Sequence, residues 1–251
     1  ARALPAPAAK MIAGGVMRVL NLIAVAALPG LLLAQPARHS LELLPAPASA
    51  QLVRSLEAAA IHSTHVWRDT PPLNDDGSVN AYIEISRGDR CKFEFDMRAN
   101  SLALDRMMPV DVGGYPVNYG FVPQTVSYDG DPFDALVLGP ALPRGRLVRG
   151  AIVRLMFMED EMGLDSKVVL SVIGRDGRPI HQLTRGEQRL IADYFKRYKE
   201  HEPGKFSKVP GWGSVAQGLS HVTTTHAFFR ECRQLAGQPC ERRSAPSRDA
   251  P

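Results

Sequence analysis

Residues 80–86 and 91–96 alternate polar and apolar side chains in the manner of β-strands. In the second segment this alternation places Lys92 and Glu94 on one face of a strand and the aromatic side chains on the other. Further short strands are predicted at residues 102–106, 151–158 and 168–173, and an aromatic-rich segment at 118–123 leads into an acidic stretch. The middle of the chain is therefore predicted to be a set of short strands.

Two helices are predicted after these strands, each opened by a capping box. Thr184 and Glu187 have the spacing of the first box, and Ser214 and Gln217 have that of the second. After the first box, apolar side chains recur on one helical face: Leu190, Ile191, Tyr194, Phe195 and Tyr198. Short strands followed by two helices favour an α+β fold with a small β-barrel as its core.

The acidic stretch carries three carboxylates within six residues: Asp129, Asp131 and Asp134. Gly130 and Pro132 separate them and exclude a regular helix, while the apolar run after Asp134 predicts a buried strand. Ionised carboxylates this close repel one another, and their pKa values rise unless a metal ion or a base neutralises them. A polar turn before a strand is the commoner explanation of an Asp-Gly-Asp sequence. A second acidic loop at residues 159–167, also next to a predicted strand, makes a metal site more attractive.

Three metal-dependent interpretations of this loop compete. An EF-hand counted from Asp129 requires Gly at its sixth position and Glu at its twelfth, where this chain has Asp134 and Pro140. An aspartyl-phosphate loop has acids that follow a buried strand, whereas here the strand follows the acids. The third interpretation is a site for several Mg²⁺ ions that transfers a phosphoryl group to water.

The composition is that of a globular protein with a core, because 45% of the 251 residues are apolar and 22% are charged. The net charge of +4 suits an anionic ligand, but the chain has no run of Lys and Arg, so no nucleic-acid partner is expected. No spacing of Cys and His matches a zinc site. Cys232 and Cys240 lie close enough in sequence to form a disulfide if the chain is exported, and the sequence leaves their pairing open.

Residues 1–50 differ in composition from the rest of the chain and are predicted to be a leader and linker. Met17 and Arg18 precede an apolar run at residues 19–34, which Pro29 interrupts. The run is shorter than the roughly 20 residues that span a bilayer, and a charged start before a short apolar core is typical of a secretory signal peptide. We therefore expect an exported protein, periplasmic or secreted, with organelle targeting, an uncleaved membrane anchor and a cytoplasmic location as alternatives. The folded domain is predicted at 51–235 and a disordered tail at 236–251.

Residues 129–134, with the sequence DGDPFD, are the most specific of several segments that occur in the same order in a known family. The others are residues 83–85, 92–96, 105–106, 115–123, 160–167, 195–199 and 211–212. Together they resemble the soluble family I inorganic pyrophosphatases, from about Trp67 to Trp212. The resemblance implies a small closed five-stranded, OB-like β-barrel flanked by helices.

The resemblance also implies an activity, the hydrolysis of pyrophosphate to two orthophosphates by a metal-activated water that attacks in line. Asp131 is implied as the general base, and the implied ligands of several Mg²⁺ ions, for which Mn²⁺ could substitute, are Asp129, Asp134, Asp165, Asp160 and Glu94. The implied pyrophosphate-binding side chains are Lys92, Arg106, Tyr119, Lys167, Tyr198 and Lys199. A homo-oligomer is implied as well, and contact with a membrane is expected only through an uncleaved leader.

The chemistry of these side chains is consistent with the implied roles. Carboxylates are the ligands that Mg²⁺ takes in proteins, and Lys, Arg and Tyr supply charge and directional hydrogen bonds to phosphoryl oxygens. Two other functions stay open: broader hydrolysis of polyphosphates or nucleotide anhydrides, and binding of cations or phosphate without turnover. Rates on tripolyphosphate and ATP relative to pyrophosphate would distinguish the first, and the complete set of acids and bases argues against the second.

Overall fold

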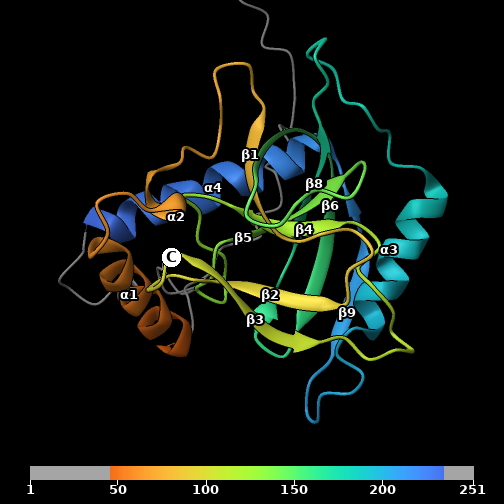
Figure 1. The fold of residues 1–251 in the computed structure, drawn as a ribbon, viewed down its shortest axis with the longest axis horizontal. Helices are drawn as coiled ribbons and strands as arrows, with labels where there is room; N and C mark the ends of the chain where they lie inside the picture. The colour runs from red at the N-terminus through yellow and green to blue at the C-terminus, as the bar shows by residue number, and fades with distance from the viewer. Residues whose placement is uncertain (1–45, 235–251) are drawn as a thin grey trace, which may run out of the picture. The chain divides into compact units, whose positions relative to one another are not determined.

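The computed structural model describes residues 46–234, drawn in colour in Figure 1. The predicted tail at 236–251 and nearly all of the predicted leader lie outside this range, so both remain predictions. Among residues 46–234, no helix is long and apolar enough to cross a membrane.

The central element is a ring of five paired strands (Figure 1). Its members, in order around the ring, are β1 (Val79–Ile85), β4 (Asn118–Val122), β5 (Phe133–Leu138), β8 (Lys167–Val172) and β6 (Leu147–Asp160). The pairing of β1 with β6, in which Val79 lies opposite Gly150, closes the ring, and only β5 and β8 run parallel. The predicted α+β fold with a closed five-stranded core is therefore confirmed.

Four of the five ring strands, all except β6, are buried on both sides, which explains why their sequences are so apolar. Along β5, Phe133, Ala135 and Val137 join one hydrophobic cluster, whereas Leu136 and Leu138 join a second cluster that includes the buried face of a helix. That helix is α3 (Arg185–Arg197). Asp134 alternates in step with Leu136 and Leu138, and therefore lies on the side of the sheet that faces α3.

Two strands form a separate hairpin beside the ring: β2 (Cys91–Asp96) and β3 (Ser101–Met107). The register shifts between Lys92 and Phe93, as at a β-bulge. Two more strands extend the sheet from β6, namely β7 (Gly163–Leu164) and β9 (Ser207–Gly213). The sequence did not predict β9, because Pro210 and two glycines make it a weak strand by local preference, and its pairing with β6 holds it at the edge of the sheet.

Both predicted capping boxes are present. Thr184 caps the backbone of Glu187 at the start of α3, and the Glu187 carboxylate accepts a hydrogen bond from the Thr184 N–H in return. Ser214 and Gln217 exchange the equivalent bonds ahead of α4 (Val215–Gln234). Within α4, His226 contacts the carbonyl of Gln124 and stacks on a phenylalanine ring, as a packed histidine does.

Two further helices precede the ring, α1 (Ala46–Ala60) and α2 (Val66–Asp69). Helix α1 begins at Ala46, a few residues ahead of the domain start predicted at residue 51. A third hydrophobic cluster joins α1 and α2 to α4 through Leu52, Trp67 and Phe229. Cys232 is buried in this cluster, and Cys240, its partner in the pairing that the sequence leaves open, lies outside the described residues.

Candidate active site

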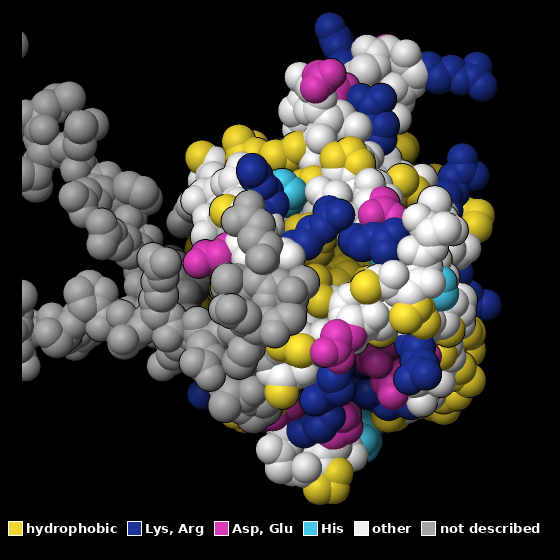
Figure 2. All heavy atoms as spheres, turned by 90° about the vertical axis from the view of Figure 1, so that its left-hand side faces the viewer, with side chains coloured by type: hydrophobic (Ala, Val, Ile, Leu, Met, Phe, Trp, Pro, Cys, Tyr) yellow, Lys and Arg dark blue, Asp and Glu magenta, His cyan; other side chains and the backbone are white. Residues whose placement is uncertain are grey.

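A cavity of about 1180 Å³ opens where the β2–β3 hairpin, the acidic loop, the β6–β7 turn and the end of α3 meet α1. Eleven of the twelve site residues predicted from the sequence line it: Lys92, Glu94, Arg106, Tyr119, Asp129, Asp131, Asp134, Asp160, Asp165, Tyr198 and Lys199. The twelfth, Lys167, contacts two of these acids. Residues far apart in the sequence are thus brought together at one place, and Figure 2 shows acidic and basic side chains gathered on this side of the molecule.

Hydrogen bonds within the acidic loop fix its shape. The Asp131 N–H donates to Asp129 Oδ1 at 3.1 Å, and the Ser127 N–H donates to the Asp131 carbonyl at 2.7 Å. Gly130 has a φ of 91°, a conformation that favours glycine. Phe133 is buried at the start of β5 and anchors the loop to the ring. The three acids therefore face the cavity from a turn of defined geometry.

Three of the predicted metal-site acids, Asp129, Asp131 and Asp165, have raised pKa values. Loss of solvation among the cavity walls, followed by the charges of Asp131 and Asp134, raises the pKa of Asp129 to about 7. The same causes, desolvation first and then Asp134 and other acids, raise the pKa of Asp131 to about 6, even though its side chain faces the open cavity. Burial also raises the pKa of Asp165 well above its usual range. The site holds more negative charge than its own cations neutralise, and positive ligands are expected to bind there.

Lys167 lies at the floor of the site. Its side chain is 1% exposed, and its Nζ donates to Asp134 and, at 2.8 Å, to Asp165 Oδ1. Burial alone would lower the pKa of Lys167, but the charges of the two acids outweigh it and raise the pKa above its usual range. The ammonium group is therefore charged and neutralises part of the acid cluster.

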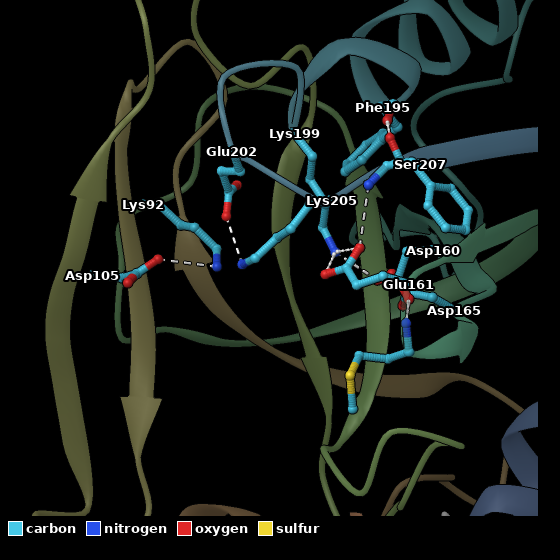
Figure 3. A network of polar contacts seen from close by, with 12 residues as sticks. Lys92, Asp105, Asp160, Glu161, Asp165, Phe195, Lys199, Glu202, Lys205 and Ser207 are labelled. Carbon is cyan, nitrogen blue, oxygen red and sulfur yellow. Dashed lines mark hydrogen bonds and ion pairs between the residues drawn. The ribbon is translucent and has the colours of Figure 1, made fainter.

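A second lysine joins α3 to the β6–β7 turn. Lys199 Nζ donates to Asp160 Oδ2 at 2.7 Å and to Glu161 Oε1 at 2.9 Å. The Asp160 carboxylate also accepts the Met162 N–H at 2.8 Å, which fixes its orientation. Figure 3 shows these side chains meeting between the end of α3 and the sheet.

The rim of the cavity carries a chain of ion pairs, of which Figure 3 shows Lys92 with Asp105 and Glu202 with Lys205. Lys92 pairs with Glu94 and, at 3.1 Å, with Asp105 on the neighbouring strand. Arg106 pairs with Asp105 at 2.6 Å and with Glu202 at 2.5 Å, and Glu202 in turn pairs with Lys205 at 2.6 Å. These pairs connect the hairpin to the loop after α3. A bound anion would find several cations already held at the rim.

Two tyrosines complete the polar lining. Burial, followed by the charges of Asp134 and Asp165, raises the pKa of Tyr119 well above its usual range. Burial and the same two acids raise the pKa of Tyr198, at the C-terminal end of α3. Both phenols therefore keep their protons at neutral pH and can donate hydrogen bonds to an anion.

Sequence reasoning missed Glu84, which lines the cavity from β1. It is buried, accepts the Phe95 N–H at 2.8 Å, and has a pKa raised well above the usual range by burial and then by Asp134. A carboxylate between Ile83 and Ile85 on a buried strand was the available signal. Glu161, Asp105, Glu202 and Lys205 were also missed; none stands out by spacing, because each is an acid or a base in an ordinarily polar segment.

The donor chemistry of the cavity fits a hard cation such as Mg²⁺, because the acids among the described residues supply its potential ligands and none of those residues that line the cavity is a Cys or His. Among residues 46–234, no three Asp, Glu, His or Cys side chains are placed to enclose one ion. Mg²⁺ seldom requires such a cage, since it usually keeps several waters and takes one or two carboxylates together with phosphate oxygens. The acid cluster is therefore suited to ions shared with a phosphate ligand.

A family model described as inorganic pyrophosphatase matches residues 81–230. The chain belongs to this family. The match includes every predicted site residue, and it makes the protein an inorganic diphosphatase. The chain is 34% identical over 151 residues to the inorganic pyrophosphatase of Saccharolobus solfataricus, an alignment that covers 57% of this chain and 87% of that relative. It is 38% identical over 161 residues to the inorganic pyrophosphatase of Thermus thermophilus, an alignment that covers 61% of this chain and 90% of that relative.

Solved structures of inorganic pyrophosphatases have the same fold. The crystal structure from Thermus thermophilus superposes with a TM-score of 0.61 and 33% identity over 66% of this chain and 99% of its own. The pyrophosphatase structure from Helicobacter pylori superposes with a TM-score of 0.59 and 32% identity. This match covers 65% of this chain and 99% of that chain. Nearly the whole of each of these pyrophosphatases is therefore matched, whereas about a third of this chain has no counterpart in either.

Proposed function

We propose that this chain hydrolyses inorganic pyrophosphate to two orthophosphates with several Mg²⁺ ions, and that Asp131 is the general base. The observation that carries this proposal is the convergence of the acids and bases on one cavity. When bound, the metal ions would neutralise the charge of pyrophosphate and increase the acidity of an attacking water. Asp129, Asp134 and Asp165 would hold the main ions, with Asp160 and Glu94 at further positions.

Asp131 is suited to accept a proton. It is fixed at the turn of the acidic loop, faces the cavity, and has a pKa near 6, so that it is ionised at neutral pH yet basic enough to take a proton from water. As the new P–O bond forms, the bond from the bridging oxygen to the attacked phosphorus breaks. The electron pair of that bond goes to the departing phosphate.

The cations and phenols of the cavity would orient the substrate and receive the charge of the departing phosphate. Lys92, Arg106 and Lys199 are anchored by acids, so their charges are in place before the substrate arrives. Tyr119 and Tyr198 would donate hydrogen bonds to phosphoryl oxygens, since both retain their protons. Lys167 would keep Asp134 and Asp165 in position beneath the ions.

The direct test of this function is phosphate release from magnesium pyrophosphate by the purified full chain, with EDTA as the metal-free control. The proposal expects release that depends on Mg²⁺ and is partly supported by Mn²⁺. Absence of metal-dependent release, or release that persists in EDTA, would contradict it.

We also propose an exported, homo-oligomeric enzyme. The support for export is the charged start and short apolar core at residues 17–34, and the support for oligomerisation is the family resemblance. The mass of the mature protein from its native host would test export, because a mature chain that retains residue 17 contradicts a cleaved signal peptide. Light scattering would test the oligomer, and a mass of one chain would contradict it.

A further inference from the structure

Helix α1 lies ahead of the segment that the family model matches, yet it is fixed to the body of the domain. Leu52 and Ala59 are fully buried in the cluster that contains Trp67. At its C-terminal end, Arg68 Nη1 donates to the carbonyls of Ala59 at 2.7 Å and His62 at 3.0 Å. These bonds hold the end of α1 and the turn after it against α2, so α1 has a defined position.

One face of α1 forms a wall of the active-site cavity, through Gln51, Arg54, Ser55, Glu57 and Ala58. The turn between β2 and β3, which includes Arg98, lines the cavity as well. The segment after α1 is tied to this turn. His62 Nε2 lies 2.6 Å from the Arg98 carbonyl, and Asn100 Nδ2 donates to the Thr64 carbonyl at 3.1 Å. Helix and turn therefore form one structural unit around the outer part of the cavity.

The cations near α1 and the β2–β3 turn differ in their partners from the cations near the acid cluster. Lys92, Arg106 and Lys199 each pair with an acid. Across residues 46–234, neither Arg54 nor Arg98 forms an ion pair within 4.0 Å; Arg54 Nη2 instead donates to Gln51 Oε1 at 2.9 Å, which orients its guanidinium. Because neither guanidinium is held in an ion pair with a carboxylate of the described part of the chain, the donors of both are available to an anion.

Two acids lie near these arginines. The carboxylate of Asp96 accepts the N–H groups of Arg98 at 2.7 Å and Ala99 at 2.9 Å, so it is engaged with the backbone of the turn. Glu57 is exposed on α1 and lines the same wall as Arg54. The guanidiniums are therefore the groups of this wall best able to bind an anion, although Glu57 reduces the net charge there.

The cavity is also larger than pyrophosphate requires. Its volume of about 1180 Å³ exceeds the roughly 300–1,000 Å³ of pockets that bury drug-sized ligands, and pyrophosphate is smaller than such ligands. If the two phosphates lie against the acid cluster, the space between α1 and the β2–β3 turn is left for a further part of the ligand.

We infer that α1 and the β2–β3 turn form a subsite for a third phosphate group, bound by Arg54 and Arg98, so that linear tripolyphosphate binds in the active-site cavity. This inference rests on the proposed function, because the acid cluster must hold the other two phosphates. Bidentate guanidinium contacts to phosphate oxygens would supply the affinity. The ligand class is then inorganic polyphosphate in addition to pyrophosphate.

The test is the affinity of Mg²⁺-loaded protein for tripolyphosphate and for pyrophosphate, measured by titration calorimetry in the Asp131→Asn variant to slow turnover. Adding Arg54→Ala or Arg98→Ala is expected to weaken tripolyphosphate binding by about tenfold, the effect of losing a hydrogen bond to a charged group. Pyrophosphate binding should change by less than about twofold. Arg54→Lys keeps the charge but not the forked donors of the guanidinium. Its affinity for tripolyphosphate should therefore lie between that of the protein with Arg54 and that of Arg54→Ala.

Arg175→Ala provides the matched control, because Arg175 is exposed and does not line the cavity. An equal loss of affinity for both ligands in Arg54→Ala, no loss for tripolyphosphate, or no binding of tripolyphosphate at all would each overturn the subsite. The proposed function fails separately, if the unmodified chain releases no phosphate from magnesium pyrophosphate. As a second measurement, inhibition of pyrophosphate hydrolysis by tripolyphosphate should weaken in Arg54→Ala of the otherwise unmodified chain, and unchanged inhibition would contradict the subsite.

Discussion

Lys167 Nζ lies 2.8 Å from Asp165 Oδ1, and both side chains are almost completely enclosed by protein. The same ammonium group contacts Asp134, so one buried cation is shared by two acids that we assign to metal binding and neutralises part of their charge. A buried pair is costly to break, because removing one partner leaves an uncompensated charge. Lys167 therefore stabilises the acid cluster before metal binds.

The first prediction concerns the loss of this cation. Lys167→Met is expected to lower the free energy of unfolding of the metal-free protein by about 3–5 kcal/mol. Added Mg²⁺ should recover part of the loss, because it neutralises the same acids. Urea unfolding in EDTA and in Mg²⁺ would measure both effects, with Lys196→Met on the exposed face of α3 as the control. Equal stability of the two variants in EDTA would contradict this account of the cluster.

A second prediction derives from the raised pKa of Asp129, about 7 in the folded chain against about 4 in an unfolded one. Between these values the folded chain holds a proton that the unfolded chain does not, so this group makes the protein less stable as pH rises from about 4 to about 7. Asp129→Asn removes this loss of stability, because an Asn side chain does not ionise. In EDTA at pH 8 we expect the variant to melt about 2–4 °C higher than the unmodified chain, which corresponds to roughly 1 kcal/mol.

The advantage of Asp129→Asn should shrink at pH 5, where the carboxyl group of the unmodified chain is already protonated. Thermal melts at both pH values would show this difference. A variant that is less stable than the unmodified chain at pH 8 without metal would contradict this prediction. It would show that the ionised Asp129 carboxylate is not destabilised by burial and by the neighbouring acids.

The third prediction is a pH dependence of catalysis. Asp131 must be ionised to accept a proton, and its pKa of about 6 without metal sets an upper limit, because bound cations lower the pKa of a nearby carboxyl group. We expect kcat/KM to fall as pH drops below about 6, with the midpoint moving to lower pH as Mg²⁺ is raised. A rate that is constant down to pH 4, or that increases on acidification, would exclude Asp131 as the base.

A fourth prediction tests the closeness of β4 to β1. A Cβ at Gly120 would come 1.8 Å from the Tyr82 carbonyl oxygen, a backbone atom that cannot move aside without disturbing β1. Gly120→Ala is therefore expected to cost about 3 kcal/mol of stability, measurable by denaturant unfolding. Gly211→Ala in β9 is the matched control, since its Cβ would meet nothing within 4 Å. Similar costs for both variants would contradict the close approach of the two strands.

The sequence predicted those elements that are determined by residues close together along the chain. The capping boxes at Thr184 and Ser214 require only the right side chains three residues apart, and both are present. The position of Glu84 beneath the cavity depends on β2 crossing the end of β1, which no local pattern encodes. Strand β9 is formed by its pairing with β6 and not by its own preference.

The residues that line the candidate site were largely named from the sequence, because the family resemblance joined segments that lie far apart along the chain. The acids around Gly130 would by themselves more often indicate a polar turn, and the family resemblance assigned their roles and supplied the distant members, such as Lys199. The distances between these side chains were beyond the reach of sequence patterns. The parallel pairing of β5 with β8 brings these strands side by side and thereby places Lys167 between two acids. The position of α1 at the cavity mouth depends on the burial of Leu52 against the third cluster.

The measurement that most directly tests the central claim is the turnover of magnesium pyrophosphate by Asp131→Asn beside the unmodified chain. The substitution keeps the shape of the side chain but removes the base, so kcat should fall by about 10²–10⁴ while calorimetric affinity for magnesium pyrophosphate is retained. Asp193→Asn, on the exposed face of α3, should leave kcat unchanged. Undiminished turnover in Asp131→Asn would contradict the assignment of Asp131 as the general base.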